Sequence, residues 1–272
     1  MIRQSLSFIQ LFRVNIVARV LIPTKAELLG FLAAEGNEYH YSRSHDRFFS
    51  DRGPAGKWYR INYRQNAIEF TNVEPVIQQR FYDLLVRVYG KQKSSFGSRY
   101  RIRIRRKHMV SDLLHHSRLG SLQWQVPSEV LKSKDEKVKA AWCRGYADGD
   151  GTARPYEVDF DSTNRSGLEQ VQDLLQSLGI SSKLRGPYHR GPYLDRFTLA
   201  IPKKNLPRYA ELIGFNHPPR KHRLHEALKK NPGGSRAIMV LPGKQGTLCL
   251  LPGGIRTRDD IHPPNDYCSV SQ

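Results

Sequence analysis

Two short stretches decide the fold: Leu28-Leu29-Gly30-Phe31-Leu32-Ala33-Ala34-Glu35-Gly36 and Cys143-Arg144-Gly145-Tyr146-Ala147-Asp148-Gly149-Asp150-Gly151. Both place a glycine third and an aromatic residue fourth, and both end in an acid followed by glycine. The two acids, Glu35 and Asp150, are 115 positions apart (150 − 35), about the length of one small domain. A repeated helix ending in an acid predicts two similar halves that meet on these helices and bring the acids together.

The composition indicates a folded and strongly basic protein. The 272 residues include 44 Lys and Arg against 25 Asp and Glu, a formal net charge of +19, and 39% are hydrophobic, enough for a core. This length fits about two small domains. Positive charge spread along the chain favours a polyanionic partner, nucleic acid first, over a basic enzyme with an unrelated substrate.

Several classes of protein are excluded by the sequence. Three scattered cysteines are too few for a disulfide framework or a C-x-x-C zinc site, so a reducing, intracellular setting is expected. The pairs His115–His116 and His222/His225 have possible ligand spacing, but no cysteine or carboxylate set completes a zinc site. No apolar run is long enough to span a bilayer, so no membrane partner is expected.

The two ends of the chain differ from its middle. Residues 1–25 contain four cations and no acid, which resembles an organelle presequence; a leader without a function, or an added helix, is the favoured interpretation. Repeated Pro and Gly residues predict an irregular tail over residues 231–272. The first repeat is predicted over residues 26–125, and the connection and second repeat over residues 126–230.

Each half is predicted to run helix, strands, helix, strands, helix. Period-two stretches predict strands over 39–43, 58–64, 67–71, 99–106, 156–161 and 196–201. Apolar residues at helical spacing predict further helices over 76–89, 109–119, 168–178, 206–213 and 221–228.

Small residues mark one face of each motif helix. Such residues let two helix backbones approach closely, so the predicted helix interface comprises Gly30, Ala33, Gly145 and Gly149. The glycines that follow the acids, Gly36 and Gly151, are expected to leave the helices in the left-handed conformation.

A close crossing places two carboxylates together, each at the negative end of a helix dipole. A divalent cation removes this conflict, and Mg²⁺ commonly binds through one or two carboxylates while keeping several waters. The predicted metal site is Glu35 and Asp150 with Ala34 and Gly149, for Mg²⁺ or another divalent cation such as Mn²⁺. Such a metal can activate a water and stabilise a phosphodiester leaving oxygen. Two solvated helix ends are the alternative.

The two segments resemble the paired motifs of the LAGLIDADG homing endonucleases in their single-chain, two-repeat form. Val126-Pro127 is similar to the family's connection between repeats, and three stretches are similar to landmarks of its second repeat: 162–164, 178–180 and 213–221. The resemblance covers about residues 26–228 and excludes the leader and the tail.

This resemblance implies an α+β fold: two pseudo-symmetric αββαββα repeats with antiparallel β saddles and a central two-helix interface. It implies a monomer that cuts both strands of duplex DNA, with Glu35 and Asp150 as metal-binding catalytic acids and Lys221 as a basic residue near the centre. Motif one departs from the family at Ala33, where an acid is frequent. Repeat one has no lysine matching Lys221, so Gln123, Gln125 or Lys107 would substitute, and one strand-cleaving half would be weaker.

The predicted strands present cations on one side. Arg101, Arg103 and Arg105 alternate with Tyr100, Ile102 and Ile104, and Arg60, Asn62 and Arg64 alternate with Tyr59, Ile61 and Tyr63. Such strands fit the DNA major groove, where Arg reads guanine and Asn reads adenine; a solvated basic face is the alternative. In repeat two, Glu157, Asp159 and Asp161 make this face poorer in cations, so its contacts would come from Lys183, Arg185, His189, Arg190 and Arg196. Uneven affinity for the two half-sites is predicted.

Three functions remain open on the sequence. The leading hypothesis is a site-specific, metal-dependent DNA endonuclease of the homing type. The second is an RNA maturase that assists splicing of its host intron, and the third is a DNA-binding protein that has lost cleavage. Binding that weakens steeply with salt fits all three.

Overall fold

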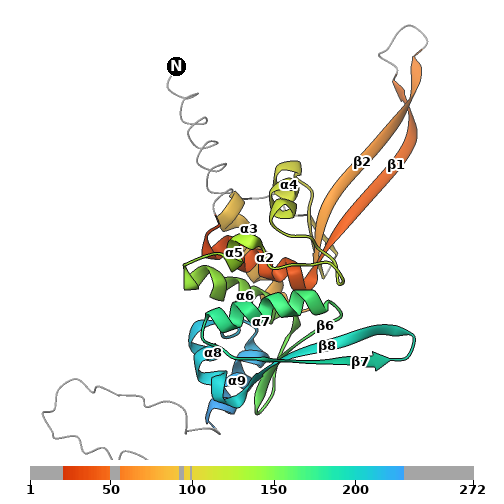
Figure 1. Ribbon diagram of the computed structural model, residues 1–272. Helices are drawn as coiled ribbons and strands as arrows, with labels where there is room; N and C mark the ends of the chain where they lie inside the picture. The colour runs from red at the N-terminus through yellow and green to blue at the C-terminus, as the bar shows by residue number, and fades with distance from the viewer. Residues whose placement is uncertain (1–20, 50–55, 92–94, 99, 230–272) are drawn as a thin grey trace, which may run out of the picture. The chain divides into compact units, whose positions relative to one another are not determined.

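A computed structural model of the chain describes residues 21–49, 56–91, 95–98 and 100–229 (Figure 1). These residues belong to one compact unit, Met1–Ser235. The predicted tail and residues 1–20 of the predicted leader lie outside the described residues. Among the helices of the described ranges, none is both long and apolar enough to cross a membrane.

The elements follow the predicted order in both halves. The first half contains α2 (Pro23–Glu35), β1 (Gly36–Phe49), β2 (Lys57–Thr71), α3 (Pro75–Tyr89), β3 (Ser95–Ser98), β4 (Arg101–Ile104) and α4 (Lys107–His116). The second half contains α5 (Ser128–Leu131), α6 (Glu136–Asp150), β5 (Gly151–Ala153), β6 (Glu157–Ser162), α7 (Arg165–Ser177), β7 (Lys183–Arg190), β8 (Tyr193–Pro202), the 3₁₀ turn η1 (Lys203–Asn205), α8 (Leu206–Leu212) and α9 (Pro218–Lys229).

Two antiparallel sheets repeat the same topology. Their strand orders are β1-β2-β4-β3 and β5-β6-β8-β7. The glycine after each acid opens the first strand and faces a phenylalanine of the next strand: Gly36 pairs with Phe70, and Gly151 pairs with Phe160. This common register relates the two halves residue by residue and confirms the predicted α+β fold of two repeats.

The aromatic residue of each motif helix anchors its own half of the core. Phe31 lies edge-on to Phe70, with ring centroids 5.9 Å apart, and Phe70 stacks on Phe81 of α3 at 4.0 Å. In the second half, Tyr146 occupies the position of Phe31 and meets Phe160 at 5.7 Å, also edge-on. The repeated aromatic in the sequence therefore marks a repeated contact between helix and sheet.

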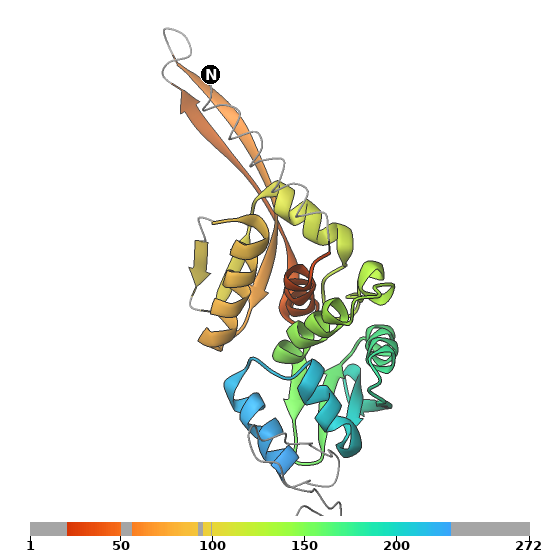
Figure 2. The ribbon, with the colours of Figure 1, turned by 90° about the vertical axis from the view of Figure 1, so that its left-hand side faces the viewer.

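The helices α2 and α6 lie side by side between the two sheets (Figures 1 and 2). A Cβ atom on Gly30 would lie 2.1 Å from the carbonyl oxygen of Trp142, and one on Gly145 would lie 2.1 Å from that of Glu27. Only glycine fits at either position, because real Cβ contacts are never this short. The two helix backbones can therefore touch because each helix has a glycine at the point of contact.

Two details of this interface differ from expectation. The residue that meets Gly149 is Ala34, whose Cβ would lie 2.3 Å from a Cβ at Gly149, whereas Ala33 is buried in the core. Gly36 and Gly151 are extended, with φ of −89° and −77°, not left-handed. Their lack of a side chain is needed for space, because a Cβ at Gly36 would lie 2.3 Å from the carbonyl oxygen of Leu32.

The largest departure from the predicted elements is the β1–β2 ribbon. The predicted strands 58–64 and 67–71 form one strand, β2, which pairs with β1 from Gly36–Phe70 to Phe49–Lys57 without a register shift. The ribbon extends beyond the helices (Figure 1), and most of its outer side chains on both faces are exposed. The predicted helix 109–119 ends earlier, at His116.

Candidate active site

Glu35 and Asp150 end the two crossing helices. The Cγ of Glu35 would lie 3.1 Å from a Cβ built on Gly149, the residue before Asp150. Burial raises the pKa of Asp150 to about 8, and the negative charge of Glu35 is the next cause. Burial also raises the pKa of Glu35 above its usual value. The crossing therefore brings the predicted pair of acids together, as an electrostatically unfavourable pair.

Asn72 orients the Glu35 carboxylate. Its amide nitrogen donates to Oε1 of Glu35 at 3.1 Å, and its own Oδ1 accepts from the backbone N–H of Glu74 at 2.9 Å. Asn72 directly follows β2, so the strand end positions it beside the helix end. The hydrogen bond favours the ionised carboxylate and lowers the pKa of Glu35 against the effect of burial.

Arg220, in the first turn of α9, is the cation that acts on both acids. Its Nη1 donates to the carbonyl oxygen of Ala147 at 3.0 Å and to that of Asp148. Its charge lowers the pKa of Glu35 and of Asp150 against the larger effect of burial. The guanidinium therefore partly offsets the repulsion between the carboxylates.

The sequence pointed to the neighbouring residue. Lys221 is exposed, and neither Lys221 nor Lys107 is among the charges that shift the pKa of Glu35 or Asp150. Of the proposed substitutes in repeat one, Gln123 donates to the carbonyl oxygen of Leu119 at 2.8 Å, and Gln125 is exposed. The only signal for Arg220 was its place beside Lys221, because its role depends on how α9 packs.

Asp148 holds the segment that carries Arg220. This fully buried carboxylate accepts from the backbone N–H groups of Asn216 and His217, at 2.8 and 3.0 Å. The side-chain amide of Asn216 bridges the two repeats: it donates to Asp148 at 2.8 Å and to Glu27 of α2 at 3.2 Å. Ala33 is the counterpart of Asp148 in the first motif, so only one centre has this anchor.

The acids and their helix ends fit a divalent cation that keeps much of its own hydration. The capping N–H groups of Gly36 and Gly151 bond to the carbonyls of Leu32 and Ala147, one turn earlier. The carbonyls of Ala34 and Gly149 lie beyond them, in the last helical turns, where the helix supplies no donor. Within the described ranges no group of three or more His, Cys, Asp or Glu is placed to hold a metal. Two carboxylates with waters suit Mg²⁺ better than zinc.

Comparison with known proteins identifies the architecture. Residues 137–214 match the model of the LAGLIDADG-like domain. The homing endonuclease I-ApeI of Aeropyrum pernix is 25% identical over 213 residues, which cover 74% of this chain and 86% of that protein. The crystal structure of I-DmoI in complex with DNA and Mn superposes with a TM-score of 0.53 at 16% identity, covering 71% of this chain and 97% of that one. Residues 137–214 therefore carry a LAGLIDADG-like domain, and the chain as a whole is similar to homing endonucleases in sequence and fold.

A third relative is matched only in part. The replication factor C small subunit of Thermococcus kodakarensis is 30% identical over 181 residues, which are 62% of this chain. The chain spans 20% of the length of that protein.

In the first repeat, one face of the sheet faces away from the helices. We call it the front face. Glu69 and Arg103 are cross-strand neighbours on the front face. The other face of the same strands carries buried residues that face the core: Ile68, Phe70, Ile102 and Ile104. Arg103 lies over the ring of Tyr39 at 4.3 Å, and a row of tyrosines, Tyr39, Tyr41 and Tyr63, continues this face along the ribbon.

The predicted basic residues of repeat one divide between two faces. Arg101 and Arg103 lie on the front face, where Glu69 pairs with both, at 3.5 and 3.0 Å; Arg105 follows β4 and is exposed. Arg60, Asn62 and Arg64 alternate with Tyr63, so they lie on the opposite face. The front-face cations of the ribbon are Arg43, Arg47 and Lys57. Sequence reasoning missed these, although Arg43 follows Tyr39 and Tyr41 at period two.

In the second LAGLIDADG repeat, acids neutralise the matching face. Arg185 pairs with Glu157 at 2.9 Å, Arg196 approaches Asp161 at 3.7 Å, and Arg154 pairs with Asp159. His189 bonds to Asp195 at 2.6 Å; the side chain of Arg190 lies outside the described residues. The predicted shortage of free cations in repeat two thus has a structural cause.

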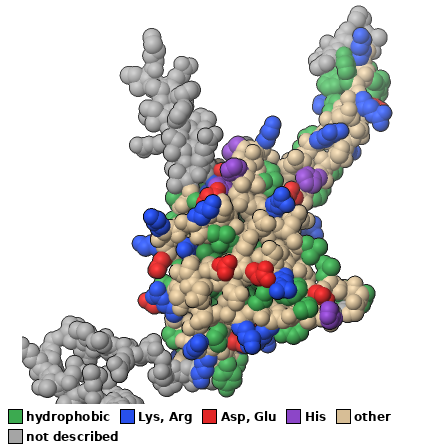
Figure 3. All heavy atoms as spheres, viewed as in Figure 1, with side chains coloured by type: hydrophobic (Ala, Val, Ile, Leu, Met, Phe, Trp, Pro, Cys, Tyr) green, Lys and Arg blue, Asp and Glu red, His purple; other side chains and the backbone are tan. Residues whose placement is uncertain are grey.

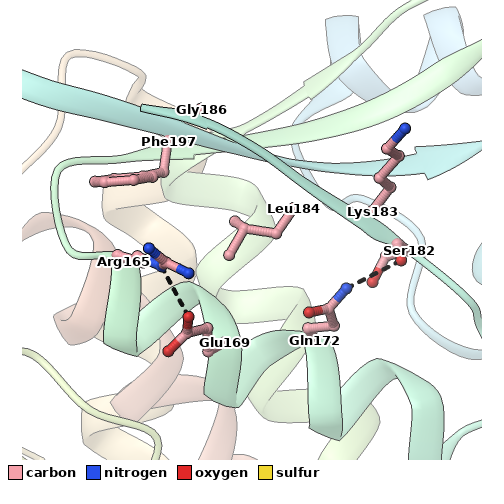
Figure 4. A pocket seen from close by; sticks show the side chains of 8 residues that line it. All are labelled: Arg165, Glu169, Gln172, Ser182, Lys183, Leu184, Gly186 and Phe197. Atoms are coloured by element: carbon pink, nitrogen blue, oxygen red, sulfur yellow. Dashed lines mark hydrogen bonds and ion pairs between the residues drawn. The ribbon is translucent and has the colours of Figure 1, made fainter. Parts of the chain in front are cut away.

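A pocket on the helical side of repeat two is separate from the acids. It lies between α7 and the strands β7 and β8 and is lined by Arg165, Glu169, Gln172, Ser182, Lys183, Leu184, Gly186 and Phe197. Leu184 points toward α7, whereas the exposed Lys183 points away from it (Figure 4). Lys183 therefore remains available on the face opposite the helices.

Proposed function

We propose that this LAGLIDADG protein is a site-specific DNA endonuclease that requires a divalent cation and cuts both strands with Glu35 and Asp150. One observation carries the proposal: the two acids meet at the ends of α2 and α6 with raised pKa values and one shared cation, Arg220. Both acids are half-buried, whereas a fully solvated pair of helix ends would not show raised pKa values. The homing endonuclease name of the Aeropyrum relative and the DNA and Mn of the I-DmoI complex support this function.

The front faces of the two sheets are the proposed surface for duplex DNA. Antiparallel strands with basic side chains on one face fit the major groove. In repeat one the contacts would come from Arg43, Arg47, Lys57, Arg101 and Arg103, with Arg105 at the edge. In repeat two they would come from Lys183, Arg185, Arg190 and Arg196, in competition with their acidic partners. Both half-sites lie within one chain, so a monomer suffices.

Mg²⁺ or Mn²⁺ would be held by the carboxylates of Glu35 and Asp150 and the carbonyls of Ala34 and Gly149. The bound cation supplies an activated water and charge stabilisation at the leaving oxygen. The hydrogen bond from Asn72 favours the ionised form of the Glu35 carboxylate and orients it. Arg220 contributes positive charge where negative charge develops on the phosphate. Lys221, one position further, would act only if bound DNA drew its side chain inward.

The test is cleavage of a plasmid library of candidate insertion sequences with Mg²⁺. Wild type is compared with Glu35→Gln and Asp150→Asn, and with Glu211→Gln and Asp173→Asn as matched controls at exposed helix positions. We expect a unique double-strand cut that is lost in both motif variants and kept in both controls. Retention of the cut in either motif variant would remove that acid from the mechanism.

Two other results would assign a different function. Tight, metal-independent binding of a specific duplex without cutting in Mg²⁺ or Mn²⁺ would indicate a DNA-binding protein that has lost cleavage. Specific binding of host-intron RNA that accelerates its splicing, with no DNA cut, would indicate a maturase.

A further inference from the structure

The outer β1–β2 ribbon has a second face, opposite the front face. We call it the back face and define it by five cross-strand pairs: Phe48–Trp58, Asp46–Arg60, Ser44–Asn62, Ser42–Arg64 and His40–Asn66. By alternation this face continues into Ile68 and Phe70, which pack against the core. Beyond the core its side chains are exposed, and no described element covers them (Figure 1). A duplex on the front face would leave the back face free.

An aromatic pair lies at the outer end of the back face. Trp58 is 70% exposed and Phe48 is 44% exposed, and their ring centroids are 5.3 Å apart at 48°. Covering the flat faces of aromatic side chains is energetically favourable, so exposure on this scale marks a surface for a partner. Hydrophobic and basic side chains lie next to each other along this ribbon in Figure 3.

Polar groups suited to a phosphate backbone follow the aromatic pair. Arg60 and Arg64 are exposed and make no ion pair with any described residue. Asn62 uses its Oδ1 to accept from Ser44 at 2.7 Å, which leaves its amide N–H groups available. Of the five Lys and Arg in residues 39–49 and 57–66, two, Arg60 and Arg64, lie on the back face, against one acid, Asp46. The charge therefore favours a polyanion over an apolar protein surface.

We propose that the back face binds single-stranded nucleic acid, with a base stacked on Trp58 and phosphates beside Arg60 and Arg64. Bases in a duplex are stacked inside it, whereas unpaired bases are free to stack on aromatic side chains next to arginine. RNA and DNA single strands share this chemistry. The availability of the back face in a DNA complex rests on the proposed function; the binding itself does not.

Tryptophan fluorescence tests the proposal at one residue. Of the three tryptophans, Trp58 is exposed, whereas Trp124 is 2% and Trp142 is 0% exposed. Titration of the full chain with oligo-uridine RNA or oligo-thymidine DNA should give saturable quenching of the exposed emission. Anisotropy of the labelled oligonucleotide should show about tenfold or greater weakening in Trp58→Ala, the loss expected for one stacked base. Tyr193→Ala, a 76% exposed aromatic on β8, is the matched control and should bind as wild type does.

A mixed-sequence duplex separates this surface from the proposed DNA site. Wild type saturated with duplex should still bind the single strand, and Trp58→Ala should keep wild-type affinity for duplex. Absence of quenching, unchanged affinity in Trp58→Ala, or full displacement of the single strand by duplex would each overturn the proposal. Binding of the single strand by a chain that binds no duplex would support this inference while contradicting the proposed endonuclease. The ratio of the affinities for oligo-uridine RNA and oligo-thymidine DNA would show which kind of single strand the back face binds.

Discussion

Gly30 and Gly145 occupy the same position in two crossing helices, and each lies against the backbone of the other helix. A Cβ at either glycine would lie 2.1 Å from a carbonyl oxygen, that of Trp142 or that of Glu27. The separation of the two catalytic candidates depends on this crossing, because Glu35 and Asp150 lie five residues further along each helix.

Gly30→Ala and Gly145→Ala should therefore push the helices apart. We expect each to lower the free energy of unfolding by about 1–3 kcal/mol, as overpacking does in well-packed cores. Lys137→Ala, on the exposed side of α6, is the control and should stay within about 0.5 kcal/mol. Urea unfolding measures the difference. Wild-type stability in either glycine variant would mean that the helices do not cross this closely in solution.

Asp150 should make the metal-free protein less stable as the pH rises. Its pKa is about 8 in the folded chain against 3.8 in the reference state. Because the pKa is higher in the folded chain, protonation of Asp150 stabilises the folded state, and this contribution is complete below pH 3.8. It is lost as the pH rises toward about 8. We expect the Tm of wild type relative to Asp150→Asn to fall between about pH 5 and pH 8 in EDTA. A pH-independent difference would show that Asp150 is ionised throughout.

Mg²⁺ should bind more tightly as the pH rises over the same interval. Binding through Asp150 requires loss of its proton, so the affinity should rise about tenfold per pH unit below the pKa of this group. Isothermal titration in buffers of different ionisation enthalpy would measure the proton released. Binding without proton release would place the cation elsewhere.

Arg220 and Lys221 can be separated by substitution. We expect Arg220→Ala to lower the cleavage rate by about 10- to 100-fold. It should also move the pH–rate profile to higher pH, because removing the positive charge raises the pKa of both acids. Arg220→Lys should restore the profile in part. Lys221→Ala should cut as wild type does; loss of cleavage there, with Arg220→Ala active, would reverse the assignment.

The two repeats should contribute unequally to duplex binding. Arg43→Ala should reduce the slope of log K against log salt by about 0.9, the value for one lost phosphate contact. Arg185→Ala should reduce it less, because Glu157 holds that guanidinium at 2.9 Å. Glu157→Gln should release Arg185 and steepen the slope. Equal reductions for the two arginine variants would contradict the predicted asymmetry.

Local patterns in the chain were sufficient to predict the motif helices, most strands, the repeat and the pair of acids. Each depends on residue spacing along one helix or strand: the glycine, aromatic and acid of Leu28–Gly36 recur in Cys143–Gly151, and the spacing alone places the acids at helix ends. The repeated aromatic also pointed to a shared contact, which the structure gives as Phe31–Phe70 and Tyr146–Phe160.

The partners of these residues could be found only in the folded chain. The charge of Arg220 acts on the acids because Asp148 holds the segment before α9. Asp148 does so through Asn216, which lies 68 positions further along the sequence. Arg60 and Arg64 lie on the back face because β2 runs without a shift from Lys57 to Phe70, so one register decides which side of a ribbon every arginine takes. Spacing along a strand specifies which side chains share a face. Packing against the core decides which of the two faces is outward, and the position of neighbouring acids decides which arginines remain without an ion pair.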